Sequence, residues 1–246
     1  MEISLEGLPP LNDVLLFLNH YELAGIALVS RRLKESSENA ALWDAVRERL
    51  WNGKFYIAPR IKELPPKQAV KESLVDATRT VITAEELTSL EWCFRFKEYA
   101  GEMWSGCDPW WLEREATRVK YTKDGNIEMK RSPDGTPAFV EVFGLSLRWR
   151  FQDHTTTTQG SKLLVSTQDR LVPSYILSRH PEHWGWLLQS CWILMVSWPL
   201  PLKTQDQDPY LLDENLAVRV EDQWDEVGRE YASSFTLTSY LPPYQH

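Results

Sequence analysis

The chain has 246 residues, and 27 Lys and Arg residues against 35 Asp and Glu residues give it a formal charge of −8. This balance, without any dense basic run, argues against nucleic-acid binding, which depends on cationic side chains that release counterions from phosphates. With 43% hydrophobic and 25% charged residues, the composition is that of a globular protein of one or two domains and excludes a largely disordered chain.

The first fifty residues predict three short helices. Asn12 or Asp13 can cap the first helix, in which Val14, Leu15 and Leu18 share one face. The second starts near residue 22 and carries Leu23, Ile26, Ala27, Ser30 and Leu33 near the helical period. The third follows residue 39, with the apolar residues Leu42, Trp43, Val46 and Leu50 on one face. Helices this short cannot bury all of their apolar faces against one another, so we expect some of this surface to meet a partner.

Residues 53–84 form a predicted connector, which is punctuated by prolines. Pro66 suits the first turn of a helix, and Val70, Leu74 and Ala77 follow it at helical spacing. We therefore expect a docked helix in this connector rather than a flexible linker.

From residue 85 to 246 the pattern predicts strands. Trp92, Phe94 and Phe96 alternate with Cys93 and Arg95, as in a half-buried strand over 90–97. The Asp-Gly turn within 123–126 predicts a hairpin over 118–130. Further strands are expected at 138–143, 145–151, 163–166, 174–178, 186–198 and 216–220. The predicted fold class is α+β, in which a helical N-terminal domain and the connector precede an antiparallel sandwich or barrel.

The N-terminal helices resemble an F-box. The resemblance rests on Leu8-Pro9, Val14-Leu15, Leu18, Glu22-Leu23, Val29-Ser30-Arg31-Arg32-Leu33 and Leu42-Trp43, with the spacing from Leu23 to Trp43 matched without a gap. Ser30 and Leu33 stand where Cys and Trp are common in that family. The resemblance covers residues 1–52, about the first fifth of the chain.

What the resemblance implies is an adaptor rather than an enzyme: F-box domains bind the Skp1 subunit of cullin-RING ubiquitin ligases, and the rest of the chain recruits the protein to be ubiquitinated. The residues that would contact a Skp1-like partner are Leu8, Pro9, Val14, Leu15, Leu18, Leu23, Val29, Leu42 and Trp43. The competing interpretation is that the same residues close an internal helical core.

Tryptophan is unusually frequent, with 12 residues in the chain. We assign most strand tryptophans to the core, because large aromatic side chains must be packed. Trp104, Trp110 and Trp111 lie outside the strand pattern and are candidates for target recognition, since Trp is a frequent interface anchor. An alternative for the β domain is a barrel or sandwich that binds a glycan or a small apolar molecule, with the helices as an appendage.

No catalytic or cofactor motif stands out, and no cofactor is expected. His180 and His183, with His154 as a possible third ligand, are better explained by a turn than by a zinc or iron site. Asp222, Asp225 and Glu226 beside Trp224 suggest a sugar-binding cleft, but a solvated acidic face is the favoured interpretation.

The cysteines and the chain's apolar segments bear on the compartment. Cys93, Cys107 and Cys191 form no C-x-x-C pair, and Cys191 is expected to be a buried small hydrophobe. The N-terminus lacks the pattern of a secretory signal, and the most apolar stretch, 184–202, is interrupted by polar residues. We therefore expect a cytoplasmic or nuclear protein with no membrane partner.

Overall fold

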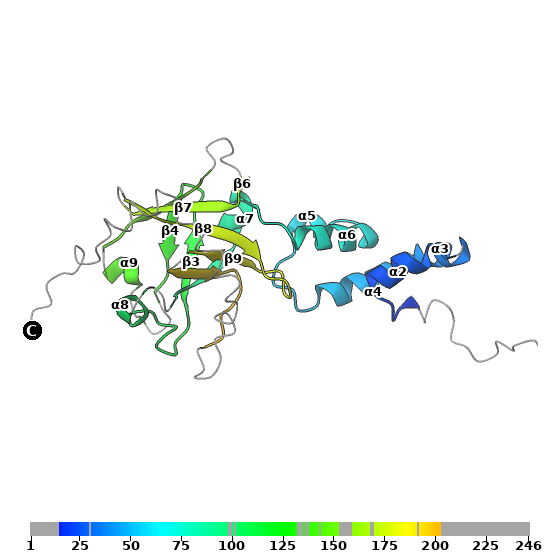
Figure 1. Cartoon of the computed structure of the whole chain (residues 1–246), viewed down its shortest axis with the longest axis horizontal. Coiled ribbons are helices and arrows are strands. Elements are labelled where there is room, and N and C mark those ends of the chain that lie inside the picture. Colours follow the sequence, from blue (N-terminus) through cyan, green and yellow to red (C-terminus); the bar gives the residue numbers. More distant parts are fainter. Residues whose placement is uncertain are drawn as a thin grey trace, which may run out of the picture. The chain divides into compact units, whose positions relative to one another are not determined.

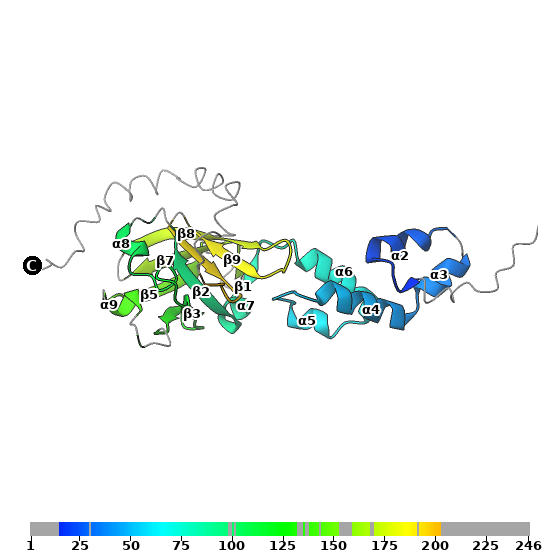
Figure 2. The same cartoon turned by 90° about the horizontal axis from the view of Figure 1, so that it is seen from below.

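The structure is a computed structural model, which describes residues 15–29, 31–97, 100, 102–131, 135, 138–142, 144–152, 159–167, 170–190 and 192–202. The chain divides into two compact units, shown in Figures 1 and 2. The helical unit comprises the described residues up to Arg79 together with Arg179–Gly185, and the barrel unit comprises the remaining described residues. No helix in the described part of the chain is long and apolar enough to cross a membrane.

The helical unit contains α2 (His20–Ile26), α3 (Arg31–Ser37), α4 (Ala40–Trp51), α5 (Pro59–Lys62) and α6 (Pro66–Asp76). Asn39 caps α4 through its side-chain oxygen, which accepts from the Ala41 N–H, and Pro66 opens α6 as its sequence position predicts. The second predicted helix is present as two, α2 and α3. The predicted first helix lies mostly outside the described residues.

One apolar cluster holds the helical unit together. Its buried members come from α2, α4 and α6, together with Leu15, which lies before α2. They are Leu15, Leu23, Leu42, Trp43, Val46 and Val70. Leu18, Ile26, Leu50 and Leu74 pack against it while remaining partly exposed. The helix predicted in the connector therefore shares a core with the N-terminal helices, and residues 53–79 belong to the same unit.

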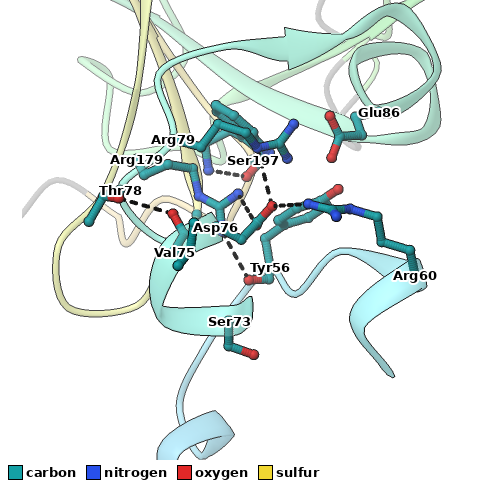
Figure 3. Close-up of polar contacts among 12 residues, drawn as sticks. Tyr56, Arg60, Ser73, Val75, Asp76, Thr78, Arg79, Glu86, Arg179 and Ser197 are labelled. Atoms are coloured by element: carbon teal, nitrogen blue, oxygen red, sulfur yellow. Dashed lines mark hydrogen bonds and ion pairs between the residues drawn. The ribbon is translucent and has the colours of Figure 1, made fainter. Parts of the chain in front are cut away.

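A buried carboxylate ends α6 (Figure 3). Asp76 accepts ion pairs from Arg60 at 3.3 Å, Arg79 at 3.2 Å and Arg179 at 3.1 Å. The side chains of Asp76 and Arg179 are each 2% exposed, and Arg179 also donates to the Tyr56 carbonyl at 3.3 Å. A buried charge needs such partners, so this ion-pair network fixes Arg179–Gly185 within the helical unit.

The barrel unit is a closed antiparallel barrel of eight strands in the order β10-β2-β3-β4-β5-β7-β8-β9. The strands are β2 (Glu91–Phe96), β3 (Thr117–Tyr121), β4 (Asn126–Met129), β5 (Leu147–Phe151), β7 (Lys162–Thr167), β8 (Arg170–Arg179), β9 (Trp186–Gln189) and β10 (Ile193–Val196). This confirms the α+β class and selects a barrel over a sandwich. A separate two-stranded sheet pairs β1 (Ile82–Thr83) with β6 (Gln159–Gly160).

The barrel interior is aromatic. Trp92 of β2 lies 5.9 Å from the Tyr121 ring of β3, measured between ring centroids, and the Tyr121 hydroxyl donates to Met195 Sδ at 3.0 Å. Trp92, Tyr121 and Met195 are all fully buried. The prediction that strand tryptophans fill the core therefore holds for Trp92 and also for Trp186 of β9.

One predicted strand was wrong, and another is divided into two strands. Residues 139–142 form a short helix, α9 (Phe139–Val142), because Gly144 takes a positive φ of 62° and its N–H donates to the Glu141 carbonyl, which closes the turn as a helix C-cap does. The stretch 186–198 is a hairpin of β9 and β10. Ser190 makes the break, since its hydroxyl accepts from the N–H groups of Trp192 and Ile193.

The remaining short helices flank β2. α7 (Ala84–Ser89) has a capping box between Thr83 and Glu86, and α8 (Glu102–Ser105) follows β2. The Asp-Gly hairpin of β3 and β4 is present as predicted, with Gly125 at a φ of 86°. The strand predicted at 216–220 lies outside the described residues.

Candidate functional site

The α2 helix of the helical unit is fixed at its start by a capping box. The Asn19 side chain accepts from the N–H groups of Tyr21 and Glu22, and the Glu22 carboxylate accepts from the Asn19 N–H at 2.7 Å. These contacts set the rotation of the helix, so that Leu23 is fully buried and Ile26 packs against the same core.

The opposite side of α2 faces solvent with apolar and small residues. Tyr21, Ala24, Gly25 and Leu28 are exposed, and their spacing of three and four positions places them on one helical face. The turns Leu28–Gly25 and Val29–Ile26 continue the helical hydrogen-bonding direction beyond the end of α2. A Cβ added to Gly25 would meet no atom within 4 Å, so the middle of this face is open.

Large apolar side chains concentrate on this segment. Phe17 is 85% exposed, Tyr21 74%, Leu28 90% and Val29 74%, and Leu16 is also exposed. We call Leu16, Phe17, Tyr21, Leu28 and Val29 the α2 apolar surface. Single exposed apolar residues are ordinary in soluble proteins, but several within fifteen positions are typical of a docking surface.

The residues predicted to contact a Skp1-like partner divide into three groups. Leu8, Pro9 and Val14 lie outside the described residues. Leu15, Leu23, Leu42 and Trp43 are buried in the helical core, and Leu18 packs against it. Val29 is exposed on the α2 apolar surface. Sequence reasoning missed Phe17, Tyr21 and Leu28. For Tyr21 and Leu28, their spacing from Leu23 and Ile26 was a helical-period signal for exposure, whereas Phe17 precedes the helix and carried no such signal.

The candidate recognition loop of the barrel unit covers the outer face of β2, β9 and β10. Trp110 is buried there in an apolar layer, the outer layer, whose buried members are Cys93, Trp110, Ala116, Leu187, Leu194, Val196 and Trp198. The Trp110 indole N–H donates to the Pro201 carbonyl at 2.8 Å. Trp110 is therefore a core residue of this layer, and the outward face of β2 is buried rather than solvated.

Trp111 and Trp104 are partly exposed. The Trp111 indole N–H donates to the Phe96 carbonyl at 2.7 Å, and its ring meets that of Trp110 edge-on at 5.3 Å. Trp104 lies 5.4 Å from the Phe96 ring. Of the three predicted target-recognition residues, these two offer indole surface to a partner, and their role in recognition stays a prediction.

Two buried charged residues, Asp108 and Arg95, lie beneath the recognition loop. The Asp108 carboxylate is 2% exposed and accepts from the N–H groups of Phe96 at 2.5 Å and Trp110 at 3.0 Å. Burial raises the pKa of Asp108 to about 6, against the opposing effects of those two hydrogen bonds and of Arg95. Arg95 is itself buried, so both charges belong to the inner support of the loop.

The described residues contain no group of three or more His, Cys, Asp or Glu side chains able to hold a metal ion. His180 and His183 stack with ring centroids 3.7 Å apart, and His180 Nδ1 accepts from the N–H groups of Glu182 and His183. Burial and the neighbouring His180 lower the pKa of His183 to about 4. The two rings lie in a turn, as predicted; His154, Cys191, Asp222, Asp225 and Glu226 lie outside the described residues.

The chain was compared with known families, characterised proteins and solved structures. No family model matches it, and neither a curated protein nor a solved structure matches it significantly.

Proposed function

We propose that this protein is a non-enzymatic adaptor of an SCF-type ubiquitin ligase, whose helical unit docks on a Skp1-like protein while the barrel unit binds the protein to be ubiquitinated. The observation that carries the proposal is the α2 apolar surface, which lies within the segment that resembles an F-box. Apolar area removed from water on docking contributes about 25 cal/mol per Å² before the costs of association.

The predicted interface residues take two roles in this proposal. Leu23 and Trp43 hold α2 and α4 in place from beneath, since both are buried in the helical core. Phe17, Tyr21 and Leu28 supply the contact area, and Ala24 and Gly25 between them let a partner helix approach the backbone closely. Aromatic residues at the centre of a docked surface are the usual energetic anchors.

The barrel unit is assigned to target binding, with Trp104 and Trp111 as its proposed contacts. The alternative, a lumen that binds a glycan or small apolar molecule, has less support, because the aromatic side chains at Trp92 and Tyr121 contact one another inside the barrel. Trp149 also points its ring to that of Tyr121 at 6.1 Å.

The docking proposal is tested by measuring the affinity of the purified full chain for a purified Skp1 protein by calorimetry. We expect Phe17→Asp and Leu28→Asp each to weaken binding on the order of tenfold or more, because a buried charge without a partner is costly. Val75→Asp is the matched control, since Val75 is 61% exposed on α6 of the same unit. Unchanged affinity of both surface variants, or an equal loss in the control, contradicts the proposal.

A steric variant separates docking from folding. Gly25→Gln places a good helix former where a side chain meets open space, so we expect the free chain to be as stable as the parent or more stable by up to about 1 kcal/mol. The same side chain would obstruct the approach of a partner to α2, so Skp1 affinity is expected to fall. A variant that is stable and binds as well as the parent would show that α2 is not the contact.

A further inference from the structure

One wall of the barrel carries a concentration of positive charge. The strands β3, β4, β5 and β7 are neighbours in the barrel, and basic residues lie on their outward side. We call these residues the basic wall: Arg118 and Lys120 of β3, Lys130 directly after β4, Arg148 and Arg150 of β5, and Lys162 of β7. Their inward neighbours, such as Val119, Tyr121 and Phe151, are buried, which fixes the basic residues on the solvent side. The wall is unexpected on a chain whose formal charge is −8.

The acidic residues on this wall neutralise only one side of it. Glu91 accepts ion pairs from Lys130 at 2.5 Å and Arg118 at 4.0 Å, and its pKa is lowered chiefly by the Lys130 hydrogen bond. Lys120 stands in register between Glu91 and Glu128. The β2–β3–β4 side of the wall is therefore balanced by its own carboxylates.

The β5–β7 side has no such balance. Among the residues that the structure describes, no salt bridge joins Arg148, Arg150 or Lys162 to a carboxylate; Asp124 in the β3–β4 turn, next to Lys123, attracts Arg148 at longer range. Arg148 and Arg150 are exposed and project from alternate positions of one strand, about 6.7 Å apart. Guanidinium groups at this spacing can each form a bidentate pair with a carboxylate.

We propose that the basic wall, centred on Arg148 and Arg150, binds an acidic segment of another protein. An extended segment with Asp or Glu at every second residue has the same side-chain spacing as β5, so its carboxylates can meet both arginines at once. That the protein carrying this segment is the recruited target rests on the adaptor function proposed above. The binding of an acidic segment rests on charge complementarity alone and does not depend on that function.

A protein segment fits the wall better than nucleic acid does. Glu91 and Glu128 lie within the same surface and would repel a phosphate backbone, whereas a polypeptide can place its own basic or neutral residues there. The outward positions of β3, β4, β5 and β7 in the described residues also hold no aromatic side chain on which a base could stack.

The test uses the full chain and a fluorescein-labelled deca-glutamate peptide, with binding measured by fluorescence anisotropy at low and physiological salt. We expect the double variant Arg148→Glu/Arg150→Glu to weaken binding on the order of tenfold or more. The control double variant Lys62→Glu/Lys71→Glu changes net charge equally at exposed positions of the helical unit and should leave the affinity within about twofold. Both pairs are exposed, so their circular dichroism spectra should match that of the parent.

Three results would overturn the proposal. The first is that the unaltered chain does not bind the peptide, and the second is that both double variants lose peptide affinity equally. The third is that an oligothymidylate of the same charge binds the chain more tightly than the peptide does at the same salt concentration. Skp1 affinity is measured in parallel and should be unchanged in Arg148→Glu/Arg150→Glu. If Arg148→Glu/Arg150→Glu loses peptide binding and keeps Skp1 binding, the result supports the basic wall as the binding site. If the parent chain does not bind Skp1, the adaptor function is contradicted, but the conclusion from peptide binding is unaffected.

Discussion

The guanidinium of Arg95 lies over the Trp110 indole, with 4.4 Å from its central carbon to the ring centroid, on the outer side of β2. Both residues are buried, and Asp108 lies beside them with its two backbone hydrogen bonds. The aromatic face stabilises the buried cation, and the Asp108 carboxylate attracts it electrostatically. The hydrogen bonds from Phe96 and Trp110 to Asp108 hold the loop that carries Trp110 to β2.

The burial of Asp108 in this layer makes the stability of the barrel depend on pH, because removal from water raises the pKa of the carboxyl more than Arg95 and the two hydrogen bonds lower it. The pKa of Asp108 is raised to about 6 in the folded chain from an ordinary value of 3.8, so the folded state binds its proton more tightly than the unfolded state does. The stabilisation from this group is therefore fully present below about pH 4 and is lost as the pH rises through about 6. Urea unfolding at several pH values measures it.

The variant Asp108→Asn isolates this contribution. We expect it to remove the dependence between about pH 4 and 6, and to cost about 1–3 kcal/mol because an amide nitrogen would face the Phe96 N–H. Asp44→Asn is the control, since the Asp44 side chain on α4 is 44% exposed and pairs with Arg47 in a solvated setting. A pH dependence that persists unaltered in Asp108→Asn would show that another group titrates in this range.

Truncation of Trp110 tests its place in the outer layer. Trp110→Ala removes a fully buried indole and its hydrogen bond to Pro201, and we expect a loss of about 3–5 kcal/mol in the free energy of unfolding. Leu112→Ala, two residues further along the same loop and half exposed, should change stability by no more than about 0.5 kcal/mol. Equal unfolding midpoints for the two variants would be inconsistent with a packed Trp110.

The ion-pair network of the helical unit gives a third prediction. Asp76→Ala leaves the buried Arg179 guanidinium without its carboxylate, and we expect a loss of about 3–5 kcal/mol, observed as earlier urea unfolding of the helices by far-ultraviolet circular dichroism. Glu35→Ala breaks the exposed pair with Arg31 and should cost no more than about 0.5 kcal/mol. If Asp76→Ala is as mild as the control, the network contributes little.

The sequence predicted correctly those helix starts and turns that are determined by residues adjacent in the chain. The start of the third helix after residue 39, the Pro66 start of the connector helix and the Asp-Gly turn at 124–125 depend on neighbouring residues only, and each is present. The alternation Trp92-Phe94-Phe96 correctly identified the interior face of β2. It could not show that Cys93 and Arg95 are buried too, because their cover comes from residues 104–116 and 187–200, far away in the chain.

The errors have the same origin. The branched and aromatic residues of 138–143 favour a strand, but the Gly144 cap decided for a helical turn. No strand pattern includes Trp110, so the sequence predicts a recognition role for it. Its burial depends on the hairpin of β9 and β10, for which the sequence predicts a single strand. On α2, the Asn19 capping box fixes where the helix starts, and this start decides which residues face the core and which face solvent.

The ion pair between Asp76 and Arg179 joins positions 103 residues apart in the sequence. During synthesis, the helices up to residue 79 leave the ribosome long before Arg179 does, and at typical elongation rates the interval is on the order of ten seconds. Throughout that time the Asp76 carboxylate lacks its buried partner, so the helical unit is completed only after most of the barrel strands have been made. A nascent chain that stops before Arg179 would therefore present these helices to chaperones in an unfinished state.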